Sequence, residues 1–286
     1  MKIDRHFLEL NMGIVCLSTS GILGRLVTMA PEVTIFWRCI LAMIFIGLFI
    51  AVNKISIRIK SRNDLYYIIG GGFLMAVHWV TYFYSLTLAN IAIAILTLHS
   101  FPAFTAVLEP IILKTKFKVY HIFLTALVIL GVWIILPSDD LGNHMVLATL
   151  FGLVSGLTYA LRNIFTRKVI PKYHGSSMMF FQLILISIFL LPFVFIYDSE
   201  NMITEWPYVA LLALVTTAIG HTLLVQNFKY YSVITVSLIS CIVPVYAILW
   251  GVFFLDEIPQ INTLIGGSLI LFSFLFESYM SSKSSK

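Results

Sequence analysis

Charged residues are scarce in this chain of 286 residues. Asp, Glu, Lys and Arg make up 11% of it, whereas 60% of the residues are hydrophobic and the mean hydropathy is +0.99. A soluble domain has about a quarter charged residues and about half apolar residues. Apolar runs of ~18 residues or more recur along the chain, and each is long enough to cross the hydrocarbon core of a bilayer as a helix. The composition therefore excludes an ordinary soluble domain and predicts an all-α integral membrane protein.

Cysteine and catalytic motifs are also scarce. The 3 cysteines, Cys16, Cys39 and Cys241, lie in apolar runs without CxxC spacing, so we interpret them as small buried side chains. The chain has no GxxxxGK[ST] phosphate loop, which argues against an ATP-driven pump. It has no HExxH motif, and its internal Asp pair, Asp139–Asp140, falls in a short predicted loop. We therefore predict no metal and no cofactor, and a membrane-embedded enzyme is a remote alternative.

Proline, glycine and charged residues divide the chain into ten predicted spans. No segment between them is long enough to form a soluble domain, and we interpret the N-terminal apolar run as a retained span rather than a cleaved signal peptide. The spans lie near residues 9–27, 33–52, 65–86, 90–113, 119–136, 145–167, 177–197, 206–228, 232–255 and 260–279.

The basic residues are placed asymmetrically. With a cytoplasmic N-terminus, 16 of the 18 Lys and Arg residues lie on the cytoplasmic side, and only Arg25 and Arg38 remain. The opposite loops are acidic. This pattern predicts that both termini are cytoplasmic in a multi-pass protein of the cell membrane. It also argues against a nucleic-acid partner, because the basic residues are spread over short loops.

An internal repeat divides the chain into two halves. FPAFTAVLEPIIL (101–113) aligns with VPVYAILWGVFFL (243–255) at an offset of 142, and AVHWVTYFYSLTLAN aligns with AIGHTLLVQNFKYYS at the same offset. Two units of five spans, residues 1–137 and 144–280, would enter the membrane in opposite orientations. Such inverted repeats place a substrate site near the bilayer midplane. A stripe of small residues on the sixth span suits close helix packing: Ala148, Gly152, Gly156 and Ala160.

The second half resembles the EamA-type family of drug/metabolite transporters. The resemblance rests on VPVYAILWGVFFLDEIPQINTLIGGSLILFS (243–273), with Pro244, then Glu257 thirteen residues on, then Gly266 and Gly267. In the first half, the arginine of IFWRCILA, Arg38, resembles the one typical of the family's second helix. The resemblance implies a ten-helix carrier of small metabolites, commonly an exporter. One departure is that Thr115 stands where the first repeat would match Glu257.

Polar and aromatic residues in mid-span are the candidates for a substrate site. Charged groups cost about 2.5–3.5 kcal/mol each at the bilayer centre, so they normally face a cavity or a partner. We expect a cavity lined by the third, fourth, eighth and ninth spans with contributions from the first and sixth. For each histidine the alternative is a neutral ring bonded to a neighbouring helix, and for each aromatic residue it is packing. The predicted lining is His78, Trp79, Tyr82, His99, Tyr159, His221 and Tyr246.

Two prolines and three charged residues have other expected roles. Pro102 and Pro244 each remove a backbone donor and are expected to kink the fourth and ninth spans. Arg38 either attracts an anionic group or, as we favour, locks two helices through backbone carbonyls. Glu109 is interpreted as a structural ion pair near Lys114, with proton coupling as the alternative, and Glu257 as a cap or staple of the outer hairpin.

These features predict a secondary transporter, an exporter of small polar metabolites such as amino acids or their derivatives, that works by alternating access. Its partners are a small-molecule substrate, the bilayer and, in a coupled mechanism, protons carried by His78, His99 or His221. The oligomeric state is left open between monomer and homodimer. A lipid-linked sugar carrier or a multidrug carrier of the same fold is the alternative, and a channel or scaffold is a further one that the repeat disfavours.

Overall fold

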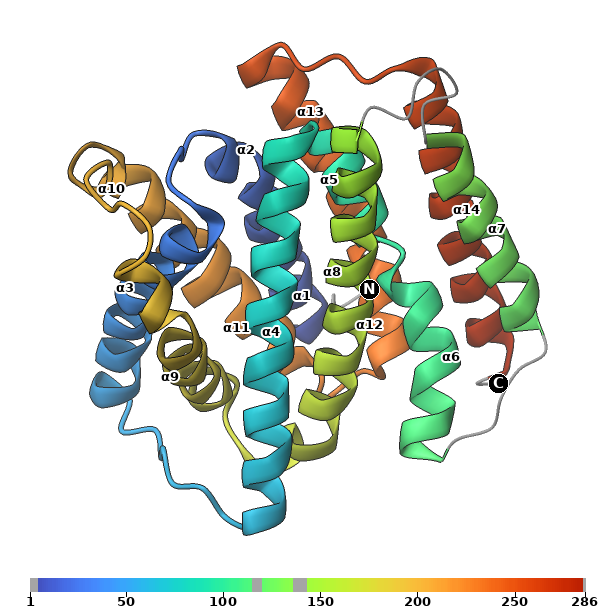
Figure 1. Ribbon diagram of the computed structural model, residues 1–286. Coiled ribbons are helices and arrows are strands. Elements are labelled where there is room, and N and C mark those ends of the chain that lie inside the picture. Colours follow the sequence, from blue (N-terminus) through green and yellow to red (C-terminus); the bar gives the residue numbers. More distant parts are fainter. Residues whose placement is uncertain (1–4, 115–119, 136–142, 285–286) are drawn as a thin grey trace.

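The computed structural model describes residues 5–114, 120–135 and 143–284, and within these ranges every regular element is a helix (Figure 1). The first and last residues of the fifth predicted span, 119 and 136, and the predicted loop 137–142 lie outside the described residues. The first part of the chain forms α1 (Arg5–Ser18), α2 (Ser20–Arg25), α3 (Pro31–Val52), α4 (Arg62–Leu88), α5 (Ile91–Leu98), α6 (Phe101–Leu113) and α7 (Tyr120–Ile135).

The second part of the chain has more helical elements than the first, because the eighth and ninth predicted spans are each divided into shorter helices. It forms α8 (Asn143–Val169), the 3₁₀ turn η1 (Ile170–Lys172), α9 (Gly175–Val194), α10 (Met202–Leu211), the π-helix η2 (Leu212–His221), α11 (Thr222–Asn227), α12 (Val233–Ile239), the 3₁₀ turn η3 (Ser240–Ile242), α13 (Val243–Leu255) and α14 (Ile261–Ser284).

Seven continuous helical segments among the described residues are long and apolar enough to cross a membrane. Two shorter apolar helices, Val243–Leu255 and Ile261–Ser273, follow them. Many large apolar side chains point outward; Phe195, Ile203 and Trp133, for example, are 82%, 82% and 74% exposed. A surface of this kind is stable against lipid rather than water. The protein is therefore a multi-pass helical membrane protein.

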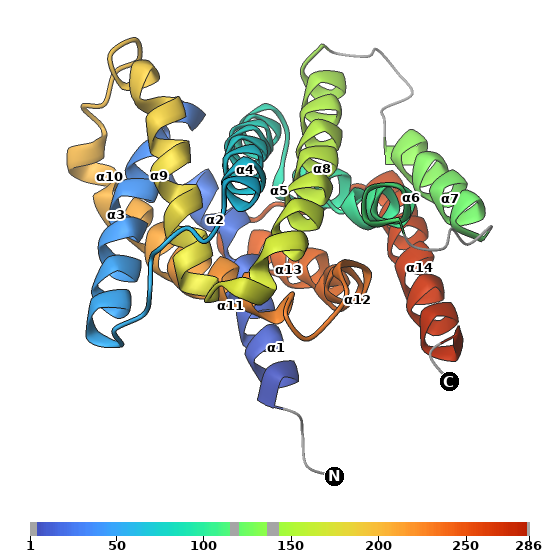
Figure 2. The same ribbon diagram turned by 90° about the horizontal axis from the view of Figure 1, so that it is seen from below.

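The helices pack as a central pair with a further pair on either side. In both views α4 lies along α8 in the middle, α3 lies beside α9 at one edge, and α7 lies beside α14 at the other edge (Figures 1 and 2). The central pair joins the two halves of the chain, since α4 precedes residue 137 and α8 follows residue 143.

The small residues of α8 allow α4 and α5 to approach closely. A methyl group at Gly152 would lie 1.9 Å from the hydroxyl oxygen of Thr97 on α5, and one at Gly156 would lie 2.8 Å from the carbonyl oxygen of Leu98. On α4, Ser85 donates a hydrogen bond to the carbonyl oxygen of Ala148 at 2.7 Å. The small stripe is therefore a packing surface for two neighbouring helices.

Several helices of the two halves begin or end at positions that differ by 142 residues, the offset of the sequence repeat. Both α6 and α13 have 13 residues, start 142 residues apart, and carry proline at the second helical position. Each ends at a residue in the left-handed conformation, Lys114 with φ of 56° and Asp256 with φ of 53°. Likewise α3 ends at Val52 and α9 at Val194, again 142 residues apart.

The fourth and ninth predicted spans are both interrupted just before their prolines. The first stops at Leu98 and resumes at Phe101, so Pro102 sits in the first turn of α6. In the ninth, the 3₁₀ turn η3 separates α12 from α13, which has Pro244 in its first turn. A proline in a first turn costs no backbone hydrogen bond, because the first N–H groups of a helix have no intrahelical partner. A side chain from each break, His99 in the fourth span and Ser240 in the ninth, lines the cavity described below.

Candidate functional site

A cavity lies where the broken helices meet the central pair. Its free volume is about 50 Å³, which is room for a few water molecules. Its walls come from α1, α2, α4, α5, α6, α8, η2, α11, η3 and α13. The lining residues are Leu17, Ser20, His78, Trp79, Tyr82, Ile95, Leu98, His99, Phe101, Tyr159, His221, Leu224, Ser240 and Val243.

Six of the seven side chains predicted for the site line this one cavity: His78, Trp79, Tyr82, His99, Tyr159 and His221. The seventh, Tyr246, is not part of the lining and is half-buried on α13. Val243, which does line the cavity, is three residues earlier, so Tyr246 lies about 4.5 Å further along the helix axis.

Trp79 and His221 are joined by a hydrogen bond across the two halves of the chain. The indole Nε1–H of Trp79 donates to Nε2 of His221 at 3.3 Å, and the rings meet edge to face at 5.2 Å. Because an indole nitrogen can only donate, Nε2 of His221 is the acceptor and the ring proton belongs on Nδ1. In the described part of the chain, that Nδ1 is buried and has no hydrogen-bond partner. His221 therefore offers a donor to whatever enters the cavity.

His78 is held against α8. Its Nδ1 lies 2.8 Å from the hydroxyl oxygen of Ser155, and that hydroxyl donates to the backbone oxygen of His78 at 3.0 Å. The ring of Tyr159, one turn further along α8, stacks on the imidazole with centroids 4.3 Å apart. The ring of His78 is thus fixed from two sides and presents one face to the cavity.

His99 occupies the break between α5 and α6. Its Nδ1 donates to the carbonyl oxygen of Ile95 at 2.8 Å, and its ring lies edge to face with Phe101. It also lies next to the backbone of Ser240, in the corresponding break of the ninth span. The histidine therefore connects the two interruptions.

Tyr82 presents a second unused polar group. Its hydroxyl oxygen is buried and, among the described residues, has no hydrogen-bond partner. Buried polar groups are nearly always paired in proteins, so each unpaired group needs an explanation. Two unpaired donors on one cavity, Tyr82 and His221, suit a ligand that supplies acceptor oxygens.

Arg38 is fully buried and links α3 to the π-helix η2. Its Nε donates to the hydroxyl of Thr217 at 2.6 Å and its Nη2 to the hydroxyl of Thr216 at 2.7 Å. The guanidinium carbon lies 4.3 Å from the centre of the Trp79 ring. We expected Arg38 to lock helices through backbone carbonyls; the observed partners are threonine hydroxyls, since the carbonyl oxygen of Leu212 already accepts from both threonines.

Glu257 joins three segments rather than capping its own hairpin. One carboxylate oxygen accepts from Nε of Arg25 at 2.8 Å, and the other accepts from the backbone N–H of Ile91 at 2.8 Å. It therefore ties the end of α2 to the start of α5. These partners come from the distant first half of the chain and not from the hairpin that we expected Glu257 to cap or staple. Glu109 is buried on α6, outside the cavity lining.

Arg162 is a functional candidate that we did not predict. In the sequence it is one of the 16 basic residues assigned to the cytoplasmic side. It is fully buried on α8, where Nη2 donates to the amide oxygen of Gln182 at 2.6 Å and Nη1 to that of Asn163 at 3.0 Å. The signal in the sequence is its distance from the basic cluster: Arg162 stands more than one helical turn before Arg167 and Lys168, inside the apolar run.

A metal centre finds no support in the ranges that the structure covers, where no group of three or more His, Cys, Asp or Glu side chains is placed to hold an ion. What the geometry defines is a helical membrane protein with a central polar and aromatic cavity, the architecture of a membrane transporter. The EamA-like transporter family matches residues 10–136 and 146–279. The chain belongs to this family, whose members are transporters and not enzymes.

Individual relatives agree with that family and differ in what they carry. The chain is 26% identical over 228 residues to an uncharacterized transporter of Archaeoglobus fulgidus, covering 80% of this chain and 81% of that protein. It is 22% identical over 245 residues to a pseudopaline exporter, CntI, of Pseudomonas aeruginosa, covering 85% and 84%. It is 28% identical over 105 residues to an S-adenosylmethionine uptake transporter of Rickettsia bellii, covering 37% and 36%.

One solved crystal structure superimposes with a TM-score of 0.73 at 14% sequence identity, covering 98% of this chain and 99% of the other. At that identity the likeness concerns the fold alone. The protein is therefore a multi-pass membrane transporter with a small-molecule substrate.

Proposed function

We propose that the protein is a secondary transporter that exports small polar metabolites with an apolar portion, such as amino acids or their derivatives. The observation that carries this proposal is the central cavity, in which aromatic rings alternate with two unpaired buried donors, Tyr82 Oη and His221 Nδ1. Rings from Trp79 and Tyr159 would contact the apolar portion of a substrate, and the donors would bind its oxygens.

The proposed architecture is ten membrane helices in two inverted five-helix units, residues 1–137 and 144–280. It is supported by the constant offset of 142 between equivalent helix ends and between the two helices that begin with a proline turn. An odd number of spans in each unit makes the second unit upside down relative to the first. Alternating access would then be a rocking of one unit against the other around the cavity.

The proposed location is the cell membrane with both termini cytoplasmic. Support comes from the distribution of Lys and Arg, 16 of 18 of which lie in the segments that would face the cytoplasm. Export is the proposed direction; the relatives include both an exporter and an uptake transporter. A lipid-linked sugar or multidrug carrier is the second candidate, and the small volume of the cavity favours the smaller substrate.

The test compares metabolites in the medium of cells that produce the wild-type protein, the His221→Ala variant, or no added transporter. We expect compounds that are enriched outside only with the wild type. The control His144→Ala removes an exposed histidine at the start of α8 and should behave as wild type. If no compound changes in either direction while the protein is present in the membrane, the proposed function is wrong. Depletion from the medium would reverse the direction only.

Proton coupling is tested separately in vesicles containing the purified protein and an identified substrate. His78, His99 and His221 are the proposed proton carriers because all three line the cavity. Transport that responds to an imposed pH gradient in the wild type and loses the response in a histidine variant supports coupling. Equal transport with and without the gradient excludes it.

A further inference from the structure

Two fully buried arginines, Arg38 and Arg162, flank the cavity without a carboxylate partner. Arg38 bonds to threonine hydroxyls, and Arg162 bonds to side-chain amides and to the sulfur of Met179. Neither takes part in a salt bridge within the described ranges. The neutral partners accept some of the hydrogen bonds, while Nη1 of Arg38 is buried and has no partner among the described residues. Neutral partners leave the charge uncompensated, and an uncompensated charge inside a membrane protein is costly.

Both charges act on the cavity. Arg38 lies directly behind Trp79, with 4.3 Å between the guanidinium carbon and the ring centre, and it acts electrostatically on Tyr82. Arg162 is three residues after Tyr159 on α8, and both arginines act electrostatically on His78 and His221. Away from water these fields are weakly screened, so the interior of the cavity is electropositive.

No acidic side chain opposes that field in the cavity wall, since the lining contains neither Asp nor Glu. Three acids outside the cavity wall already hold other groups. Asp64 accepts from Lys172 at 2.7 Å, and Glu205 accepts from the backbone N–H and hydroxyl of Thr28. Glu257, as described above, is bound to Arg25. The missing negative charge is therefore not supplied by these acids.

We propose that the substrate supplies it: the cavity selects metabolites that carry a carboxylate and a net negative charge, and it discriminates against cations. The carboxylate oxygens would accept from Tyr82 Oη and His221 Nδ1, the two unpaired donors, while Arg38 and Arg162 compensate the charge from behind the wall. This inference rests on the proposed function and specifies the substrate class of the same site.

The experiment measures which compounds in the medium change in level when the wild-type protein is produced. These compounds are then grouped by their net charge at pH 7. We expect them to be carboxylates with a net negative charge. Arg38→Gln and Arg162→Gln should reduce the change in these anions by about tenfold or more, which corresponds to the loss of ~1.4 kcal/mol of stabilisation. Arg38→Lys and Arg162→Lys keep the charge and should retain the preference for anions.

Two further variants separate charge selection from folding. Arg58→Gln removes one positive charge from an exposed loop and should leave the anion changes as in the wild type. Tyr82→Phe keeps the buried ring and removes only its hydroxyl, so it tests the donor even if an arginine variant fails to reach the membrane. We expect it to lower the anion changes by about tenfold as well.

The outcomes are distinct. Changes confined to cations, zwitterions or uncharged compounds overturn the anion selectivity and leave a transporter of small metabolites in place. Anion changes that survive both arginine-to-glutamine substitutions and Tyr82→Phe also overturn it. The absence of any change with the wild-type protein overturns the proposed function itself.

Discussion

Trp79 donates a hydrogen bond to His221 although the two residues are 142 positions apart, and 142 is also the offset between the two halves of the sequence. The residues that correspond in the two halves therefore touch each other at the cavity wall. In a pair of units related by a two-fold axis, only residues next to that axis can contact their own counterparts. The proposed axis of the transporter thus passes beside the cavity.

The first prediction concerns this contact. Trp79→Phe keeps an aromatic ring but removes the indole donor, and His221→Ala removes the acceptor. A double-mutant cycle on the free energy of unfolding in detergent should show a coupling of about 1 kcal/mol, because a typical hydrogen bond contributes that much and the bond is lost in either single variant. Trp133→Phe, on the exposed face of α7, should leave unfolding unchanged. Strictly additive effects of the two changes would contradict the contact.

The second prediction concerns the link between Arg38 and the π-helix. Thr217→Val keeps the shape of the side chain but leaves Nε of a buried guanidinium without its acceptor. We expect the free energy of unfolding to fall by about 1.5–3 kcal/mol, as for hydrogen bonds to charged groups. Thr217→Ser retains the hydroxyl and should lose clearly less. Thr158→Val, which removes an exposed hydroxyl bonded within its own helix, is the matched control.

Much of the fold could be predicted from the sequence, because hydropathy and proline report directly on where helices run and break. The predicted span 33–52 coincides with α3 except for its first two residues. Near Pro102, where we predicted a kink of one continuous span, the chain has a break between α5 and α6. The segment LALVTTAIGH gives no comparable sign of a π-helix. Its form accompanies the bonds of Thr216 and Thr217 to Arg38, which are contacts between distant parts of the chain.

The residues that line the cavity could largely be predicted from the sequence, but the buried arginine beside it, Arg162, could not. Polar and aromatic residues in mid-span pointed to His78, Trp79 and Tyr82, because such side chains need a partner inside a membrane. Arg162 was missed since a basic residue near a span end reads as a topology signal. Its burial depends on Gln182, which lies on a different helix 20 residues away.

The third prediction concerns the contact between α5 and α8. Gly152→Ala places a methyl group 1.9 Å from the hydroxyl oxygen of Thr97, so the two helices must separate. We expect a loss of about 1–3 kcal/mol in unfolding free energy, the usual cost of overpacking. Adding Thr97→Ala should recover part of it, because it removes that hydroxyl.

Gly47→Ala is the control for this experiment, as its methyl group would meet a neighbouring atom only at 3.5 Å. Alanine is the better helix former, so propensity alone predicts no loss at Gly47. A destabilisation as large at Gly47 as at Gly152 would mean that the contact with Thr97 does not set the cost.

A further pair of contacts joins the two halves near opposite ends of the molecule. Near the start of α4, the buried carboxylate of Asp64 accepts from Lys172 Nζ at 2.7 Å and from the Tyr173 hydroxyl at 2.9 Å. Near the start of α10, Glu205 accepts from the backbone N–H and hydroxyl of Thr28. Figure 1 shows these two helix starts at opposite ends. In each contact an acid near the start of a helix in one half of the chain holds the loop that follows a helix of the other half.

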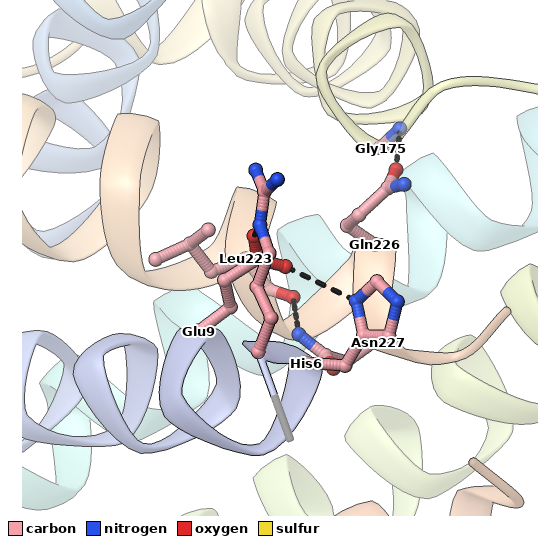
Figure 3. A network of polar contacts seen from close by, with 7 residues as sticks. His6, Glu9, Gly175, Leu223, Gln226 and Asn227 are labelled. Atoms are coloured by element: carbon pink, nitrogen blue, oxygen red, sulfur yellow. Dashed lines mark hydrogen bonds and ion pairs between the residues drawn. The ribbon is translucent and has the colours of Figure 1, made fainter. Parts of the chain in front are cut away.

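The end of the molecule that carries Asp64 is held by additional polar contacts. The backbone N–H of Gly175 donates to the side-chain oxygen of Gln226 at 2.6 Å, and Asn227 bonds back to the carbonyl oxygen of Leu223 (Figure 3). His6 at the start of α1 lies 3.4 Å from Glu9 and stacks on Tyr230. The hydrogen bonds among these contacts stay within one half of the chain and the His6–Tyr230 contact is a ring stack, whereas Asp64 forms an ion pair with Lys172 in the other half. Asp64 is therefore the contact at this end to change when the closure between the two halves is tested.

The fourth prediction follows from these two acids. If the units rock against each other, Asp64→Asn weakens closure at the end proposed to be cytoplasmic, and Glu205→Gln weakens closure at the outer end. In a cysteine-free background with Leu17→Cys in the cavity wall, an impermeant thiol reagent should label faster from the cytoplasmic side with Asp64→Asn and from the outer side with Glu205→Gln. Each change should be about tenfold, because one charge-assisted hydrogen bond contributes about 1.5–3 kcal/mol to the closed state. Asp198→Asn, in the loop before α10, serves as the control for loss of an acid. Faster labelling from the same side in both variants would contradict opposite closures, since each acid would then hold the same conformation.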